Sequence, residues 1–410
     1  MEPGNAGDGR VNLDVIEPVD FDEFHSVTLP EAAEAHVGRV QAHLRGLPTL
    51  SLELPDGRSA TYRVTDDRVE VLHGEVRPDA TAELDEQSWQ EFALELRSCY
   101  SLLYSGRVQF RNGHFGALER WEPVLRGLLD GRPLADPQAD ELTDAEGRPL
   151  DLGRSFRLDD DPVAMGRFVE QAGFLHASGV FTPDEIAALS DETERLRAAA
   201  RPDDGRSWWA RTADGDERCC RLNYANEGSQ VIAEVADDGR LDRLVAITGE
   251  DVRRAPDRLD GHTVVIKLRE ATEGLADLPW HRDCGMGGHP VLCPEFNVGI
   301  QLDDATAGSG QLHVLAGSHR SSSRPPSPKG DDRPVVRLDT RAGDVTLHYG
   351  HLMHAAPPPT GAGGRRALYC TYVQERAFEF VPAGRAFNDV LFEEAGDGRI
   401  ASVGESRSRD

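Results

Sequence analysis

Short β-rich runs joined by loops limit the fold of the second half of this chain more than any other feature. The loops are rich in Gly, Asp and Pro, and the runs read VVIKL, FNVGIQL, QLHVL, VVRLD, DVTLHY and ALYCTYV. Such a series of short strands is typical of a β-sandwich or a jelly-roll barrel. A surface helix precedes them, because Thr182 can cap it, Pro183 suits its first position and Glu185 completes a capping box.

The first half of the chain predicts a smaller α+β unit over residues 31–135. A helical stretch to Leu44 is followed by alternating runs, which read TLSLELP, ATYRVT, RVEVLHG and DATAELD. We expect these runs to form antiparallel hairpins, because turn pairs separate them. Asp85 can then cap one helix, and a second helix ends before Gly131.

Composition sets the expected boundaries between the domains. A chain of 410 residues has room for two or three domains, and we expect two. Residues 1–30 lack periodicity, and Asp, Glu, Gly and Pro displace the apolar period over residues 136–155. We interpret these stretches as a weakly ordered lead-in and a linker. The barrel domain then covers residues 156–395, followed by a tail at residues 396–410, and the fold class is α+β and mainly β.

The charge of the chain excludes several classes of partner. Its 45 basic and 72 acidic residues give a formal net charge of −27, whose field repels phosphate backbones and anionic lipid headgroups. No run reaches the roughly 18 consecutive apolar residues of a membrane span, and the N-terminus has no secretory pattern. We therefore expect a cytoplasmic protein that binds neither nucleic acid nor membranes. Its six cysteines form no Cys-x-x-Cys pair, and we interpret them as reduced thiols.

One pair of side chains in the second half has the spacing of metal ligands. His281 and Asp283 are two residues apart, so an extended strand places both on the same face. His354 offers a third ligand from a later strand, with His348 and His351 as alternatives. Two histidines and one carboxylate form the facial triad that leaves open positions on Fe(II). The same donors also suit Zn(II), so the ligand set alone leaves the metal open.

An arginine after the last histidine favours iron with a keto acid. Arg365 lies eleven residues past His354, where its guanidinium could grip the far carboxylate of 2-oxoglutarate with two hydrogen bonds. Arg366 points to the opposite face and is the alternative anchor. Lys267 could face the barrel and help to hold the keto acid, or could lie in solvent. Asn297 needs buried partners, which either a structural hydrogen bond or the keto acid would supply.

A further cluster of aromatic and basic side chains lies in a stretch that we expect to be loop-like. Such a cluster could form a substrate lid with aromatic walls and anion-pairing arginines, or a packed insert with solvated charges. Its members are Trp208, Trp209, Arg211, Arg218, Arg221 and Tyr224.

The second half resembles the phytanoyl-CoA dioxygenase family over roughly residues 165–380. The resemblance lies in the segments FLHASGVFTPDEIAAL, WHRD, FNVGIQLDDATAGSGQLHVLAGSHR and GDVTLHYGHLMHAAPPPTGAGGRRALYCTYV. It implies a double-stranded β-helix that uses Fe(II), 2-oxoglutarate and dioxygen. By position, the implied iron ligands are His281, Asp283 and His354, and the implied 2-oxoglutarate anchor is Arg365.

Two details of this resemblance bear on the chemistry. Ala355 and Ala356 stand where the family often has Gly-Ser, so hydroxyl groups from that loop are missing. Asp283 is retained, whereas related halogenating enzymes have a small residue at this position that frees a place for halide. The resemblance therefore implies hydroxylation or another oxidative C–H reaction.

The N-terminal unit resembles the sterol-carrier-protein-like lipid-binding fold. The resemblance lies in DGRSATYRVTDDRVEVLHGEVRPDATAELDEQSWQEFA and in the later SGRVQF and LLDGRP. It implies an apolar tunnel that could hold a lipophilic substrate. A degenerate copy used for dimerisation or docking is the other interpretation, and a homodimer is a possible assembly.

Three functions follow from these patterns. The leading hypothesis is an oxygenase that acts on a small or lipophilic metabolite in a specialised pathway. A second is a lipid-binding or carrier protein with a non-catalytic barrel, which the complete ligand set and Arg365 disfavour. A third is a metal-dependent cupin-like isomerase or hydrolase, which would need neither a keto acid nor Arg365.

Overall fold

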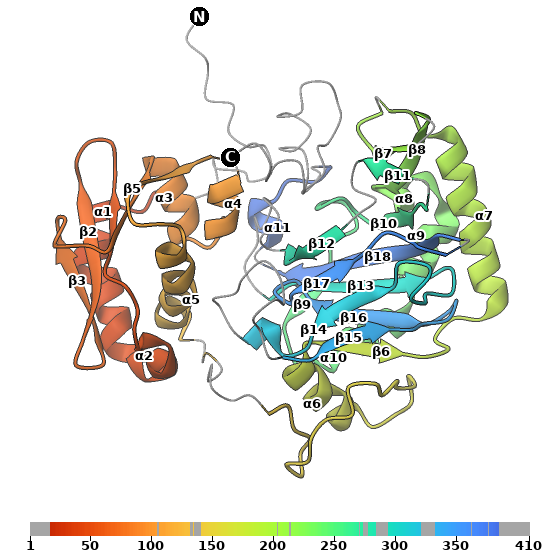
Figure 1. Cartoon of the computed structure of the whole chain (residues 1–410), viewed down its shortest axis with the longest axis horizontal. Coiled ribbons are helices and arrows are strands. Elements are labelled where there is room, and N and C mark those ends of the chain that lie inside the picture. The colour runs from red at the N-terminus through yellow and green to blue at the C-terminus, as the bar shows by residue number, and fades with distance from the viewer. Residues whose placement is uncertain are drawn as a thin grey trace, which may run out of the picture.

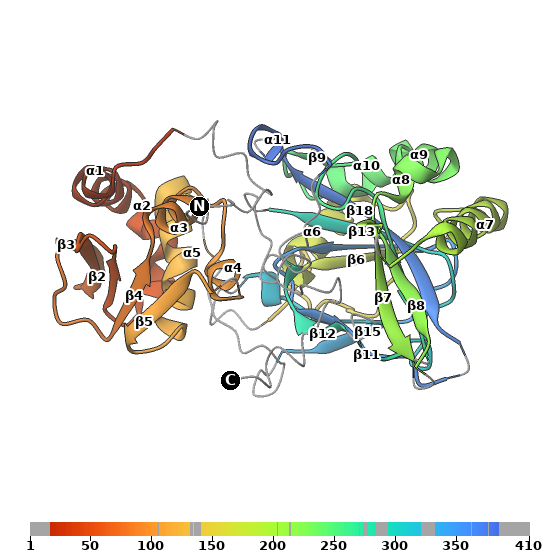
Figure 2. The ribbon, with the colours of Figure 1, turned by 90° about the horizontal axis from the view of Figure 1, so that it is seen from above.

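The computed structural model divides the chain into two lobes, each with its own hydrophobic core (Figure 1). One core runs from Phe21 to Leu128 and the other from Phe156 to Tyr372. Figure 2 shows the same two lobes from above. The residues that the structure describes are 17–104, 106–131, 134, 141–202, 204–212, 215–269, 271–273, 278–283, 294–320, 333–361, 363–375 and 377–384.

The N-terminal lobe is a five-stranded sheet with helices, in the order β3-β2-β1-β4-β5. Its strands are β1 (Leu50–Glu53), β2 (Ser59–Thr65), β3 (Arg68–His73), β4 (Ala80–Leu84) and β5 (Val108–Asn112). Its helices are α1 (Phe21–Glu23), η2 (Phe24–Thr28), α2 (Leu29–Leu44), α3 (Glu86–Ala93), α4 (Cys99–Tyr104) and α5 (Gly116–Asp130). The expected hairpins are confirmed for β1, β2 and β3, whereas β4 pairs with β1 in parallel, which local sequence patterns do not reveal.

The expectation of a weakly ordered lead-in to residue 30 is wrong for its last third. A helical segment begins at Phe21, because the side chain of Asp20 accepts a hydrogen bond from the Glu23 amide at 2.8 Å and caps its first turn. Phe21 is buried and its ring lies 4.8 Å from that of Trp89. His25 joins the same aromatic cluster, so this segment helps to form the N-terminal core.

The described part of the expected linker packs against the barrel. Residues 141–155 contain a tight turn at Asp144, closed by a bridge between Thr143 and Pro149. Leu150 and Leu152 then pack on the C-terminal core. Residues that pack on the core of the barrel lobe therefore begin before residue 156.

The larger sheet of the C-terminal lobe follows the order β11-β7-β8-β10-β18-β13-β16-β6, with β9 also paired to β18. Every described pairing in it is antiparallel. Its strands are β6 (Phe174–Ala177), β7 (Ser207–Thr212), β8 (Glu217–Leu222), β9 (Val252–Arg254), β10 (Thr263–Lys267), β11 (Ala271–Glu273), β13 (Phe296–Gln301), β16 (Val345–Tyr349) and β18 (Arg365–Gln374).

The smaller sheet has the order β12-β17-β14-β15. Its strands are β12 (Leu278–His281), β14 (Leu312–Leu315), β15 (Val335–Leu338) and β17 (His354–Ala356). From β12 to β18 the chain passes back and forth between the two sheets, and the sheets enclose one core. This alternation is the jelly-roll arrangement that the short runs predicted, so the expected fold class is confirmed.

Helices border the barrel lobe. They are α6 (Pro162–Ala172), α7 (Pro183–Ala199), α8 (Ala225–Gly228), α9 (Gln230–Ala236), α10 (Gly239–Ala246), the 3-10 turn η4 (Ser318–Arg320) and α11 (Ala377–Phe380). The predicted capping box at the start of α7 is confirmed, with Thr182 and Glu185 as its two members. Figure 1 shows α7 on the side of the lobe that faces away from the N-terminal lobe.

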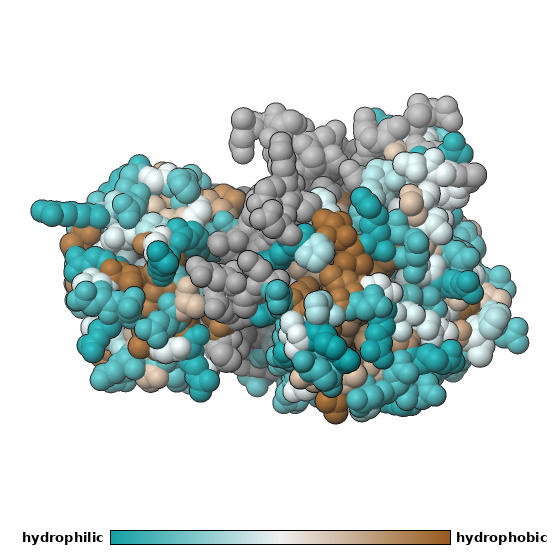
Figure 3. Space-filling view, turned by 60° about the horizontal axis from the view of Figure 1, so that its bottom comes forward, coloured by the Kyte–Doolittle hydropathy of each residue, from teal (hydrophilic) through white to brown (hydrophobic). Residues whose placement is uncertain are grey.

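The two lobes contact each other through apolar side chains. Leu96, which follows α3, and Phe380 of α11 are buried in one small cluster, and Leu94 packs against it. Figure 3 shows a mostly hydrophilic face on which hydrophobic residues gather near the middle. No helix within the described residues is long and apolar enough to cross a membrane.

A buried histidine in the N-terminal core makes the stability of this lobe depend on pH. Burial lowers the pKa of His25 to about 4, although its hydrogen bond to the Phe21 carbonyl raises the pKa. The unfolded chain therefore binds a proton near pH 6.5 that the folded lobe takes up only near pH 4. Folding is destabilised as the pH falls through this window, by about 3 kcal/mol for this residue.

We predict that His25→Gln makes the free energy of unfolding less dependent on pH. Urea titrations at pH 7 and pH 4 measure this change. The variant should lose stability less steeply than the wild type between the two values. An equally steep loss in both proteins would contradict the prediction.

Candidate metal centre

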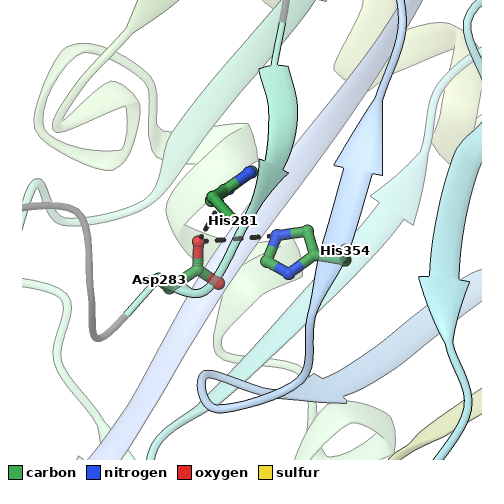
Figure 4. Close-up of side chains that lie close together, drawn as sticks. All are labelled: His281, Asp283 and His354. Carbon is green, nitrogen blue, oxygen red and sulfur yellow. Dashed lines mark ion pairs between the residues drawn. The ribbon is translucent and has the colours of Figure 1, made fainter. Parts of the chain in front are cut away.

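Two strands of the smaller sheet place the predicted metal ligands side by side. His281 ends β12 and His354 begins β17, and the two residues are direct partners in the strand register. Asp283 follows β12, where its amide donates to the Gly350 carbonyl at 3.0 Å. The three ligand atoms lie within 4.8 Å of one another (Figure 4).

One oxygen of Asp283 faces both imidazoles. Asp283 Oδ1 lies 3.4 Å from His281 Nε2 and 3.5 Å from His354 Nε2. These separations are longer than strong hydrogen bonds between charged groups. His281, Asp283 and His354 are thus brought together as the sequence predicted.

The protonation states of these groups suit a metal. His354 Nδ1 donates to the Leu352 carbonyl at 2.8 Å, so the lone pair of Nε2 faces the site. Burial lowers the pKa of His354 to about 3, which keeps its imidazole neutral at pH 7. Burial would raise the pKa of Asp283, but the nearby His354, His281 and His348 hold it well below the usual range. The centre therefore offers the neutral nitrogen of His354 and an ionised carboxylate.

The second oxygen of Asp283 is held by the larger sheet. Asn297 Nδ2 donates to Asp283 Oδ2 at 2.7 Å, and Asn297 Oδ1 accepts from the Thr371 hydroxyl at 3.0 Å. Of the two partners expected for Asn297, the structure supplies the structural hydrogen bonds. Thr371 could not be predicted from the sequence, because only the register between β13 and β18 brings it beside Asn297.

The alternative ligands lie outside the group of three. His348 of β16 is buried, and its Nε2 lies 3.4 Å from Asp283 Oδ2. Its ring centroid is 4.6 Å from that of His354. His351 lies in the turn before β17 and is only partly buried. Cys284, next to the ligands in sequence, lies outside the described residues.

Arg365 lies in the same cavity as the three ligands. Arg365 is 4% exposed, and its guanidinium donates through Nε to the Gly310 carbonyl at 2.7 Å and through Nη1 to Gln301 Oε1 at 3.1 Å. Both acceptors are neutral. Within the described residues Arg365 forms no ion pair, and an unpaired charge in such a buried place is costly.

The two other basic candidates have different surroundings. Arg366 points away from the cavity and pairs with Asp303 at 2.8 Å and Glu194 at 2.9 Å, as the alternation along a strand requires. Lys267 faces the barrel interior, and its ammonium group donates to the Ala356 carbonyl. The solvated alternative for Lys267 is therefore wrong, because this strand is covered on its inner face.

The cavity around the centre has a volume of about 130 Å³. It contains two of the six proposed substrate residues, Trp208 and Arg221. The Arg221 guanidinium lies over the Trp208 ring at 4.4 Å and pairs with Asp260 at 2.9 Å. Apolar lining residues include Leu259, Val265, Leu278 and Leu312.

The other four proposed substrate residues are not among those that line the cavity. The expected loop-like stretch is instead a hairpin of β7 and β8 within the larger sheet, in which the adjacent Trp208 and Trp209 pair with residues of β8. Arg218 pairs with Asp216 at its turn, and Tyr224 is buried after β8. Trp209 packs against the core from a partly buried position, and Arg211 lies opposite Glu217 in the hairpin.

Leu259 and Asp260 also line the cavity and were not predicted from the sequence. Both have positive φ angles, of 55° and 72°, which are unfavourable for side chains with a Cβ atom. Hydrogen bonds hold this backbone, among them the 2.6 Å bond from the Tyr224 amide to the Asp260 carbonyl. The pair Asp260-Gly261 is a turn signal that could have identified this segment.

We predict that His354→Ala weakens binding of Fe(II) or Co(II) by more than the roughly 10–100-fold that loss of an outer-shell partner costs. His313→Ala is the matched control, because His313 lies on β14 of the same small sheet and outside the cavity. Anaerobic titration of the metal-free protein measures both affinities. Equal affinities in the two variants would exclude His354 as a ligand.

Comparison with known proteins supports the same site. The family model described as phytanoyl-CoA dioxygenase (PhyH) matches residues 169–367, which contain His281, Asp283, His354 and Arg365. Iron and 2-oxoglutarate, the cofactors expected for such a domain, suit the two imidazoles, the ionised carboxylate and the buried arginine described above.

Solved structures with similar folds include EvdMO1, AviO1 from Streptomyces viridochromogenes Tue57 and EctD from S. alaskensis with bound Fe. For EvdMO1 the identity is 23%, the TM-score 0.43, and the match covers 52% of this chain but only 50% of that chain. For AviO1 the identity is 27% and the TM-score 0.42, and the match covers 54% of this chain and 98% of that chain. For EctD the identity is 20% and the TM-score 0.45, and the match covers 58% of this chain and 85% of that chain. These TM-scores are low, so the family assignment rests on the matched residues and the ligand geometry. Over residues 169–367, the barrel lobe of this chain is similar to the phytanoyl-CoA dioxygenase family.

Proposed function

We propose that this protein is an Fe(II)- and 2-oxoglutarate-dependent oxygenase that hydroxylates, or otherwise oxidises at a C–H bond, a small or lipophilic metabolite. The observation that supports this most directly is the buried Arg365. Its charge has no acidic partner among the described residues, and it shares a cavity with the His–Asp–His centre. A dicarboxylate that reaches from the metal to Arg365 would satisfy both groups.

Each residue of the centre has a separate task in this proposal. His281, Asp283 and His354 would hold Fe(II), and Arg365 would bind the far carboxylate of 2-oxoglutarate through its guanidinium fork. Bound iron with the keto acid and dioxygen supplies the oxidising chemistry. The chain positions the substrate and keeps water from the centre, because the imidazoles of His281 and His354 are more than nine-tenths buried.

Asn297 and Lys267, which the sequence suggested as cofactor-binding residues, form hydrogen bonds to the residues of the centre or near it. Asn297 holds Asp283, and Lys267 donates to the carbonyl of Ala356, two residues after His354. The ionised carboxylate of Asp283 faces both histidines, which supports oxygen transfer rather than halogenation at this centre.

The substrate would occupy the part of the cavity beyond the metal. Leu259, Val265, Leu278 and Leu312 offer apolar contacts there. Trp208 and the Arg221–Asp260 pair add one aromatic face and one polar group. This lining fits a compact, mainly apolar substrate with at least one polar group.

The N-terminal lobe would act in docking rather than in lipid transport. Its core is filled by large side chains, with Tyr62, Trp89 and Trp121 all fully buried. Trp121 also donates to the Pro48 carbonyl at 2.7 Å. Leu96 contacts Phe380 of the barrel lobe, which gives this lobe a place to dock.

We predict that anaerobic addition of Fe(II) and 2-oxoglutarate produces a weak visible charge-transfer band. Arg365→Ala should weaken 2-oxoglutarate binding on the order of 10- to 100-fold, because it removes charged hydrogen bonds. Asp283→Ala should abolish the band, because the metal loses its carboxylate.

Arg366→Ala is the matched control for this experiment. It removes the neighbouring guanidinium, which points to the opposite face and pairs with Asp303. Its band should titrate with 2-oxoglutarate as in the wild type. If the wild type binds iron but gives no band, the keto-acid function is wrong, and a cupin-like isomerase or hydrolase becomes the better hypothesis.

A further inference from the structure

His348 has no role in the ligand set, yet it lies beside the metal centre. It is on the inner face of β16, is 2% exposed and lines the same cavity as the three ligands. Neither of its ring nitrogens forms a hydrogen bond with a described residue. A neutral imidazole has one N–H donor, and buried donors normally have an acceptor. A polar group without a partner at this place therefore needs an explanation.

The nearest charged acceptor is the outer oxygen of Asp283. His348 Nε2 lies 3.4 Å from Asp283 Oδ2, the same atom that accepts the 2.7 Å hydrogen bond from Asn297. A carboxylate oxygen can accept two hydrogen bonds. Oδ1, by contrast, faces His281 and His354. The two oxygens of Asp283 thus face different groups.

The strand register explains why these groups meet. Asn297 of β13 is the direct partner of His348 on β16 and of Thr371 on β18. The three residues form a polar row across the inner face of the larger sheet, and the smaller sheet opposite presents the pair His281 and His354. Asp283 lies between the row and the pair.

We infer that His348 is a positioning residue, and this inference rests on the proposed function. His348 donates through Nε2–H to Asp283 Oδ2 and, together with Asn297, keeps Oδ1 turned toward the metal. It acts through Asp283 and does not bind the metal, because the cluster of ligand atoms comprises His281, Asp283 and His354. Two donors on Oδ2 fix the rotation of the carboxylate, whereas one donor would allow it to pivot.

Metal affinity without any substrate tests this inference. His348→Phe keeps the ring volume and removes the donor, and it should weaken Fe(II) or Co(II) binding about tenfold, as loss of an outer-shell partner does. His348→Gln retains an N–H donor and should restore most of that loss. Thermal unfolding of the metal-free proteins should change little, because Nε2 forms no close hydrogen bond before the metal binds.

His262→Phe is the matched control. His262 is buried, and its Nδ1 also has no hydrogen-bond partner in the described residues, but it does not line the cavity. Its substitution should leave metal affinity unchanged. Together the variants separate an effect at Asp283 from a general effect of removing a buried imidazole.

Two results would overturn the inference. Wild-type affinity in His348→Phe would show that Asn297 alone holds the carboxylate. A loss in both His348 variants as large as in His354→Ala would make His348 a ligand. These failures differ from failure of the proposed function, which would appear as absence of the charge-transfer band in the wild type with iron bound.

Discussion

The whole site depends on the way one carboxylate is held between two sheets. Oδ1 of Asp283 faces the imidazoles of the smaller sheet, and Oδ2 accepts from Asn297 of the larger sheet. A free carboxylate would rotate between these partners, and burial would favour its protonated form. The surrounding histidines His354, His281 and His348 instead hold the pKa of Asp283 well below the usual range, so the group stays charged in a place where an unpaired charge would be costly.

This arrangement also explains why the barrel, rather than a loop, positions the centre. A register between neighbouring strands fixes the relative places of His281 and His354, and two further registers fix those of Asn297, His348 and Thr371. A one-residue slip would turn each of these side chains to the opposite face. Metal binding and strand pairing therefore require the same strand register in the two sheets.

The residues that the sequence predicted correctly are those whose role follows from local spacing. His281 and Asp283 lie close together because they are two apart, although only His281 belongs to β12. Arg365 and Arg366 face opposite ways because they are adjacent on β18. The capping box of α7 is equally local.

The partners of Asn297 and Lys267 could not be predicted in this way. They lie 74 and 89 residues distant, at Thr371 and Ala356, and only the tertiary register brings them together. The parallel pairing of β4 with β1 has the same origin. The helix at Phe21 was missed because its few apolar residues gain their partners, such as Trp89, from the folded core.

The distribution of charge inside the barrel then determines what the cavity can bind. The chain as a whole is strongly acidic, with a net charge of −27, so its surface field does not attract anions. Inside the cavity, Arg221 is paired with Asp260, whereas Arg365 donates only to neutral oxygens. An anion that enters the cavity would therefore gain the most binding free energy at Arg365. In the proposed function this contrast would favour a dicarboxylate, because one carboxylate would meet the buried guanidinium while the other end would remain near the three ligands.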